Sequence, residues 1–149
     1  KLILIGPGGL GAKRGDMEEM VARHSGMNES EIYDAHKKNL GILMMYNAKK
    51  IDELSIHIQK KNTDAHRIKS RPISATDTLA KILIKQNTPL YVVWGEKDAS
   101  VGAYLEDRMA ILRMSNRDVH FHVQFQCGHW LMYEDEVIFN EIFYKIIQD

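Results

Sequence analysis

The sequence predicts an α/β fold with a small, mostly parallel sheet. Three short apolar runs, at about residues 2–5, 89–94 and 119–125, have the length and composition of strands. Helical patterns separate these runs, and two parallel strands can be joined only by a long crossover of that kind. We therefore expect the carboxyl ends of the strands to meet at one edge of the sheet.

Size and composition fit an ordinary globular domain. The chain has 149 residues, of which 44% are hydrophobic and 27% charged. Its 20 basic and 20 acidic residues cancel, which gives no indication of a nucleic acid or an anionic membrane as partner. No apolar stretch approaches the roughly 20 residues that span a bilayer, and a single cysteine is typical of a reducing compartment. We expect a cytoplasmic protein that binds a small molecule, with no membrane and no nucleic acid as partner.

The first strand ends in a cluster of glycines that raises the question of dinucleotide binding. Gly6, Gly8 and Gly11 match the pattern G-x-G-x-x-G. A dinucleotide site also needs a helix that opens at the third glycine and a second strand with an acidic residue about 20 positions further on. Neither follows here, and Ala12 stands where a phosphate-binding loop needs lysine. The glycines therefore indicate the sharp exit of a buried strand, and we expect no cofactor.

Residues 16–86 have a helical character and are predicted to form an inserted domain between segments 1–15 and 87–149. Capping signals predict four helices. These helices are Met17–Arg23 after Asp16, a helix from Asn28 to about Tyr46, one from about Lys49 to His66, and one from Ser74 to Gln86.

The rest of the chain, residues 87–149, returns to strand and helix in alternation. "PLYVVWGEKD" predicts a strand that breaks at Gly95, "YLEDRMAILRM" an amphipathic helix, and "EVIFNEIFYKII" a final helix. "VHFHVQFQ" alternates strictly, as a half-buried strand does. The alternation predicts an apolar face of Val119, Phe121, Val123 and Phe125 and a polar face of His120, His122, Gln124 and Gln126.

Asp98 and His129 follow two of the predicted strands directly. Because parallel strands end at the same edge, where ligands bind in open α/β sheets, these side chains can converge there. An aspartate beside a histidine can accept its Nδ1 proton and stabilise the imidazolium that forms when Nε2 takes a proton from a nucleophile. Either residue alone fits a turn cap or simple packing. Their joint placement favours a catalytic pair.

Three motifs resemble the α/β-hydrolase superfamily. "LILIGPGGLG", "VVWGEKD" and "FQCGHW" look like its post-nucleophile strand, acid loop and histidine loop. The combination of G-P-G-G with C-G-H-W is similar to the hydrolases that cleave carbon–carbon bonds in the products of aromatic ring fission (meta-cleavage product hydrolases). The resemblance covers essentially the whole chain. It implies a partial α/β-hydrolase fold in which residues 16–86 form the cap, or lid.

The resemblance also implies roles for individual residues. Asp98 would be the triad acid and His129 the general base of a hydrolase that acts on ester or carbon–carbon bonds of a small organic substrate. The residues expected to bind substrate are Trp130, Gly8, Gly9, Met44, Met45 and Arg71. The two adjacent methionines also fit simple core packing, a role in which methionine is common.

The serine nucleophile that the resemblance implies is missing. It should lie on a G-x-S-x-G elbow after a strand, but the nearest fragment, "RHSGM" around Ser25, lacks the first glycine and follows a predicted helix. Because the superfamily order is serine, acid, histidine, we expect the nucleophile before Lys1. The chain would then be the C-terminal portion of a serine-type hydrolase, inactive by itself. The alternative is a noncatalytic binding or assembly module that keeps the scaffold.

Two positions depart from the family pattern. The acid loop usually carries a proline where this chain has Gly102, and the cap often carries an arginine for the substrate carboxylate where "DELSIHIQ" offers Ile58. Arg67 or Arg71 could supply that positive charge instead. These departures leave the substrate open.

Other candidate sites and surfaces are weaker. His120 and His122 share a strand face but lack a standard zinc spacing with Cys127, so no metal is expected. Cys127 stays open as an alternative nucleophile because of its proximity to His129. The charged run "KKNTDAHRIKSR" fits a solvated helix face or cap loop. The apolar strand Leu2–Ile5 would form an exposed edge, through which we expect a homodimer or pairing with a missing N-terminal half.

Overall fold

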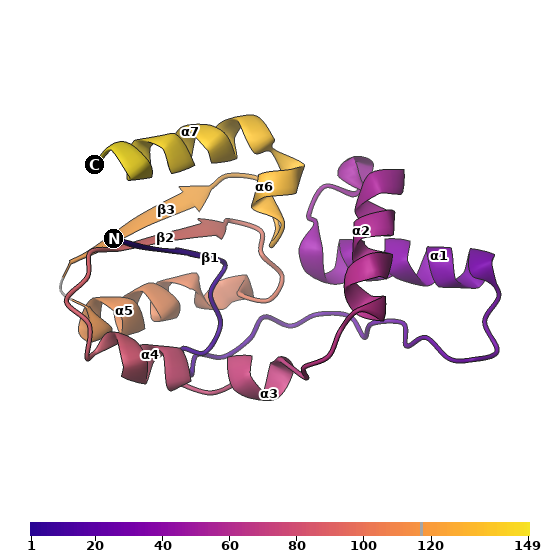
Figure 1. Ribbon diagram of the computed structural model, residues 1–149, viewed down its shortest axis with the longest axis horizontal. Coiled ribbons are helices and arrows are strands. Elements are labelled where there is room, and N and C mark those ends of the chain that lie inside the picture. The colour runs from indigo at the N-terminus through magenta and orange to yellow at the C-terminus, as the bar shows by residue number, and fades with distance from the viewer. Residues whose placement is uncertain (117) are drawn as a thin grey trace.

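The computed structural model, which describes residues 1–116 and 118–149, contains a three-stranded parallel sheet (Figure 1). Its strands, in spatial order, are β1 (Leu2–Ile5), β2 (Leu90–Gly95) and β3 (Val119–Gln124). Leu4 pairs with Val92, which pairs in turn with Phe121. The α/β class and the parallel arrangement of the three predicted strands are confirmed.

Helices cover both faces of this sheet. The described helices are α1 (Glu29–Asn39), α2 (Glu53–Asp64), α3 (Arg71–Ser74), α4 (Thr78–Leu83), α5 (Leu105–Ser115), α6 (Leu131–Glu134) and α7 (Glu136–Gln148). Figure 1 shows α4 and α5 on one side of the sheet, α6 and α7 on the other, and α1 with α2 beside it. None of the helices in the described ranges has the length and apolarity needed to cross a lipid bilayer.

The central strand β2 is buried along its whole length because it faces a hydrophobic core on each side. Val92 and Trp94 belong to the core shared with α4 and α5, where Leu112 is fully buried. Tyr91 and Val93 belong to the core shared with α6 and α7. The candidate site therefore lies at the end of a strand that is buried between two hydrophobic cores.

The glycines after β1 turn the chain beneath a second layer, as the sequence predicts. The N–H of Gly9 donates to the carbonyl of Ser74, and the carbonyl of Gly9 accepts from Leu79. The N–H of Gly11 donates to Thr76, and no helix begins there. This segment follows α3 and α4 closely instead of opening a helix toward a dinucleotide.

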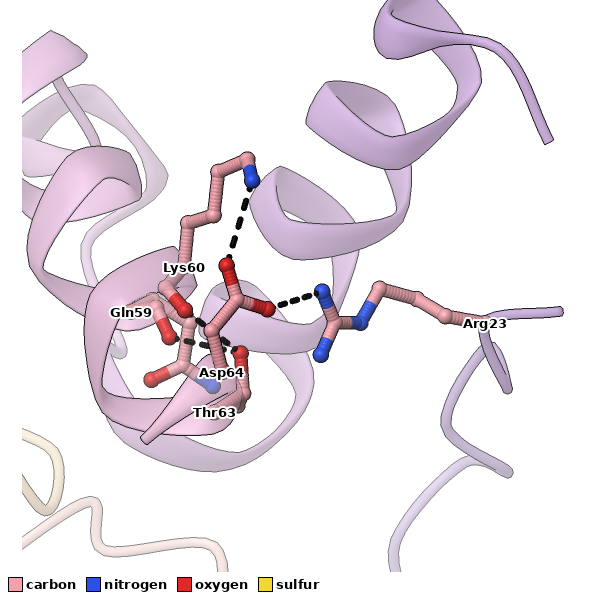
Figure 2. Close-up of polar contacts among 5 residues, drawn as sticks. All are labelled: Arg23, Gln59, Lys60, Thr63 and Asp64. Atoms are coloured by element: carbon pink, nitrogen blue, oxygen red, sulfur yellow. Dashed lines mark hydrogen bonds and ion pairs between the residues drawn. The ribbon is translucent and has the colours of Figure 1, made fainter. Parts of the chain in front are cut away.

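The predicted helix Met17–Arg23 is wrong, because other side chains bind this segment in an irregular conformation. The amide of Asn39 accepts from the N–H of Val21 at 2.8 Å and donates to the carbonyl of the same residue at 2.9 Å. Arg23 also reaches across to Asp64 on α2, at 2.7 Å (Figure 2). The backbone groups of Val21 are therefore occupied by Asn39 and not by a helical turn.

The helix predicted from Asn28 to Tyr46 is shorter than expected. Asn28 forms a capping box with Glu31, as predicted, but α1 ends at Asn39. A single π-helical turn, Leu40–Met44, follows it. The chain is extended at Met45, which brings residues 44–47 toward the loop after β3.

Two further helix predictions need new boundaries. The helix expected from Lys49 begins only at Glu53, because Asp52 accepts from the backbone N–H of Ser55 and so forms the N-cap; a 3-10 turn, Ala48–Lys50, precedes it. The region Ser74–Gln86 divides into the end of α3 and the separate helix α4. The predicted boundary at residue 86 assigns α4 to the inserted domain, but α4 packs on the sheet together with α5. The boundary therefore stays a prediction.

The alternation of β3 ends earlier than predicted. Phe125 lies beyond the strand and is 74% exposed, because the backbone turns at Gln126, whose φ is +56°. Gln124, predicted on a polar face, is buried and donates to the carbonyl of Asp135 at 2.9 Å. At Gln124 this face is therefore covered by α6 and α7, whereas His120 on the same face stays exposed.

Candidate active site

Asp98 and His129 meet at the carboxyl edge of the sheet. Asp98 lies in the turn after β2, and His129 lies in the loop after β3. Nδ1 of the imidazole is 2.7 Å from Oδ2 of the carboxylate. Asp98 is buried, whereas the His129 side chain keeps 30% of its surface exposed. A buried acid thus holds a histidine whose ring is still accessible.

The loop around Asp98 holds its carboxylate in one orientation. Its second oxygen, Oδ1, accepts from the backbone N–H of Ser100 at 2.8 Å. The main-chain carbonyl of Asp98 accepts from Val101 and Gly102. Burial by itself would raise the pKa of Asp98, but the hydrogen bond and charge of His129 and the hydrogen bonds from Ser100 outweigh it, so the pKa lies below its usual value.

Gly102, which stands where the resemblance predicted a proline, allows segment 13–15 to cross close to the loop of Asp98. Its φ is +54°, and a Cβ there would lie 2.6 Å from Cα of Gly15. The guanidinium of Arg108 joins the same two segments, donating to the carbonyls of Lys13 and Ser100 at 2.9 and 3.2 Å. The departure thus has a structural explanation within this chain: segment 13–15 occupies the space that a larger residue would need. No sequence signal indicated this role for Arg108.

Gly6 faces the ring of His129 and was missed in the sequence analysis as a site residue. A Cβ at this position would lie 2.9 Å from Cε1 and 3.1 Å from Nδ1 of the imidazole. The backbone of Gly6 is also left-handed, with φ +54°, and its N–H donates to Val93 on β2. Gly6 directly follows a strand that ends at the same edge of the sheet as Asp98 and His129. That position in the sequence is the signal for its role beside the imidazole.

The turn after β2 and the loop after β3 also pack against each other through glycine. A Cβ on Gly95 would overlap the carbonyl oxygens of Cys127 and Gly128. The N–H of Lys97 donates to the carbonyl of Cys127 at 2.8 Å. This close approach fixes the loop of His129 relative to the turn that carries Asp98.

Trp130 and Met44 lie together next to His129. The N–H of Trp130 donates to the carbonyl of Met44 at 2.8 Å, and both side chains pack against the core of the helical segment. Met45 is only 2% exposed and is part of that core itself. The segment that follows α1 therefore borders the candidate site through Met44, while Met45 fills the interior behind it.

Gly8, Gly9 and Arg71 lie around α3. A Cβ on Gly8 would lie 3.0 Å from Cβ of Ser74, and Gly9, with φ +76°, contacts Leu79. Arg71 begins α3 and is exposed, and Arg67 is also exposed. Within residues 1–116 and 118–149, neither arginine side chain forms an ion pair with Asp98.

The alternative nucleophile Cys127 has an unfavourable environment. Burial, followed by the charges of Glu134 and Asp135, raises the pKa of its thiol to about 11. The reactive form of a cysteine is the thiolate, which is scarce at neutral pH when the pKa is this high. Cys127 therefore packs as a small buried side chain.

The histidines of β3 are engaged with neighbouring side chains. His120 stacks on Tyr91, with ring centroids 4.6 Å apart, and its Nε2 is 3.0 Å from Asp118. Burial lowers the pKa of His122. Among the residues that the structure describes, no three histidine, cysteine or acidic side chains are grouped so that they could hold a metal ion.

In the described part of the chain, Asp98 is the one side chain that hydrogen-bonds the ring of His129. Ser25 lies in a turn within an irregular segment and not at a junction between a strand and a helix. The arrangement therefore pairs a carboxylate with an imidazole, and no serine of the described residues hydrogen-bonds that imidazole. It can hold and transfer a proton at Nε2 for a group that approaches from outside these elements.

Solved structures of similar fold have been identified for this chain, whereas no known protein family and no curated protein sequence matches it. A meta-cleavage product hydrolase from Pseudomonas fluorescens is 17% identical, with a TM-score of 0.66 over 99% of this chain and 55% of its own. A serine hydrolase involved in carbazole degradation is 19% identical, with a TM-score of 0.62 over 99% and 53%. A thermophilic esterase is 20% identical, with a TM-score of 0.61 over 99% and 55%.

These matches confirm the expected fold resemblance. The chain has a partial α/β-hydrolase fold and spans about half the length of the solved structures that it matches.

Proposed function

We propose that the chain is the C-terminal portion of a serine-type α/β-hydrolase that acts on ester or carbon–carbon bonds of a small organic substrate. Asp98 is the triad acid and His129 the general base. The observation that carries this proposal is the 2.7 Å contact between Nδ1 of His129 and Oδ2 of Asp98, at the carboxyl ends of two adjacent parallel strands. The fold shared with a meta-cleavage product hydrolase and an esterase supports the two bond types.

In the proposed mechanism, His129 acts through the ring nitrogen that Asp98 does not bind. With Nδ1 donating to Asp98, the free lone pair lies on Nε2, which takes the proton of the nucleophile and later returns it to the leaving group. The buried carboxylate stabilises the imidazolium formed between these steps. The lowered pKa of Asp98 supports this role, because the group stays ionised at neutral pH.

The proposal requires a serine from outside residues 1–149. In this fold the nucleophile precedes the acid and the histidine along the chain. The matched structures are nearly twice as long as the part that this chain covers, which supports a missing N-terminal portion. We therefore expect the chain by itself to leave esters unhydrolysed by the serine route.

The substrate would bind between the glycine turn and the cap. Trp130 and Met44, joined by a backbone hydrogen bond next to His129, would supply an apolar wall, and Gly8 and Gly9, which pack against Ser74 and Leu79, would border the substrate from the turn after β1. Met45 supports this wall from the core. Arg71, exposed at the start of α3, is the candidate for a substrate carboxylate.

A noncatalytic assembly module is the second candidate, and the open edge of β1 favours it. Leu2 and Ile5 are 38% and 37% exposed on this edge strand. Leu2 and Gly6 direct their N–H groups to β2, so the N–H groups of the alternate residues Ile3 and Ile5 face outward. We propose that this edge pairs with a further strand, either of the N-terminal portion or of a second copy.

One measurement separates these candidates, and a second tests the assignment of Asp98 and His129. An in-frame strand, G-x-S-x-G and helix encoded before Lys1 would support the enzyme, whereas a start codon at this position would support the module. A fluorophosphonate, which labels activated serines, should leave the purified chain unlabelled. Labelling of a serine within residues 1–149 would overturn the assignment of Asp98 and His129.

A further inference from the structure

Glu134 is a buried carboxylate that binds two segments far apart in the sequence. It ends α6 and is 3% exposed. Its Oε1 accepts from the backbone N–H of Asn47 at 2.6 Å, and its Oε2 accepts from the backbone N–H of Gly128. No lysine, arginine or histidine of the described residues forms an ion pair with it. These two N–H groups are therefore its main stabilising partners, and such charge-assisted hydrogen bonds are strong.

Both neighbours of His129 are held by the same cap segment, residues 44–47. On one side, a Cβ on Gly128 would lie 2.8 Å from the carbonyl oxygen of Met44 and from the nitrogen of Tyr46. On the other side, the N–H of Trp130 donates to that same carbonyl of Met44. The side chain of Glu134 joins Gly128 to this segment, so the loop that carries His129 packs directly against the cap.

We propose that Glu134 is a positioning residue that makes the alignment of His129 with Asp98 depend on cap residues 44–47. One carboxylate fixes Gly128, next to His129, and Asn47, at the end of the cap segment. When this segment leaves the loop, Glu134 loses its Asn47 partner and Trp130 loses the carbonyl of Met44, so Gly128 and the imidazole beside it are no longer held in one position. The inference rests on the proposed function for the role of His129, but the coupling itself is a property of the folded chain.

The first test changes only the cap side of this link. Asn47 has φ −86°, close to the value of proline, so Asn47→Pro removes the N–H that Glu134 binds. Its matched control, Asn47→Ala, keeps that N–H and loses only the side-chain cap of Lys49. In proton NMR of the full chain, Asn47→Pro should speed amide exchange at Gly128 by roughly tenfold and broaden the Nδ1 proton of His129. Equal spectra for the two variants would overturn the proposal.

The second test changes the carboxylate. Glutamine has one carbonyl oxygen in place of two acceptors, so Glu134→Gln can bind only one of the two N–H groups as before. Glu141→Gln is the control, because Glu141 is exposed on α7. Glu134→Gln should disturb the Nδ1 proton of His129, and Glu141→Gln should not. A folded Glu134→Gln chain with an unchanged Nδ1 signal contradicts the proposal. If Glu134→Gln does not fold, the comparison of Asn47→Pro with Asn47→Ala decides the question instead.

These measurements are independent of hydrolysis. If Asn47→Pro and Glu134→Gln change the Nδ1 proton signal of His129 but the complete protein has no hydrolytic activity, the proposed function is refuted and the role of Glu134 stands. If hydrolysis depends on His129 but the two variants leave that signal unchanged, only the role of Glu134 is refuted.

Discussion

Gly6 faces the imidazole of His129 so closely that a Cβ on residue 6 would lie 2.9 Å from Cε1 of the ring. Gly6→Ala should therefore displace the ring from Asp98, and the left-handed backbone at this residue adds about 1–2 kcal/mol of strain. We expect a weaker Nδ1 proton signal of His129 in NMR and a lower free energy of unfolding in urea. Gly41→Ala is the control, since a Cβ there makes only an ordinary contact, 3.5 Å from Ile51. Identical His129 signals in Gly6→Ala and the parent chain would contradict this relationship.

Placing a proline at residue 102, the residue expected there from the resemblance noted in the sequence, should destabilise the chain. Proline cannot adopt the φ of +54° found at Gly102, and it would remove the N–H that donates to the carbonyl of Asp98. We expect Gly102→Pro to lower the free energy of unfolding by about 3 kcal/mol in urea titration. An unchanged unfolding midpoint would show that segment 13–15 does not depend on the glycine.

The stability that Asp98 contributes should depend on pH in a defined direction. Its pKa lies below the usual value, so the unfolded state binds this proton more tightly than the folded state. The contribution is full above the unfolded pKa of about 3.9 and is lost as the pH falls through the folded pKa. The difference in unfolding free energy between the parent chain and Asp98→Asn should therefore shrink below about pH 4. A difference that stays constant in acid would contradict the lowered pKa.

The thiol of Cys127 should resist alkylation in the folded chain. Its pKa is raised to about 11, first by burial and then by Glu134 and Asp135. At about pH 8, iodoacetamide should react about 100-fold more slowly with the folded chain than with the chain in urea, because the thiolate is scarcer and shielded. Cys127→Ser gives the background of the assay. Equal rates in the two states would reopen Cys127 as a nucleophile.

The open edge of β1 should cause self-association. A charge on an edge strand opposes pairing with another strand, so Ile5→Lys should reduce the oligomer fraction in sedimentation at micromolar concentration. Ile84→Lys places the same change on an exposed residue outside the sheet and should leave association unchanged. A monomeric parent chain would contradict pairing between copies. It would leave the N-terminal portion as the proposed partner of the edge.

The sequence predicted the parts of the fold that depend on local pattern. The apolar runs and the helices after Tyr104 and Asp135 are placed within a residue or two, because composition and periodicity determine them. Asp98 and His129 could be paired in advance because strand ends of a parallel sheet must meet at one edge.

The errors arise where distant contacts override local preference. Residues 17–23 carry good helix formers, but Asn39 binds the backbone of Val21, which no local pattern reveals. The role of Glu134 likewise depends on Asn47, far away in the sequence. Gly6 was visible as a glycine, but only the structure shows that His129 occupies the space beside it.

The most direct test of the central claim is ester hydrolysis by the protein expressed from its complete reading frame. The parent protein should hydrolyse a 4-nitrophenyl ester and react with a fluorophosphonate at a serine that precedes Lys1. Asp98→Asn should lower kcat by about 10⁴-fold and His129→Gln by about 10⁶-fold, the losses typical of a triad whose acid or base is removed. Unchanged turnover in His129→Gln would contradict the assignment of Asp98 and His129 as the acid and base of a catalytic triad.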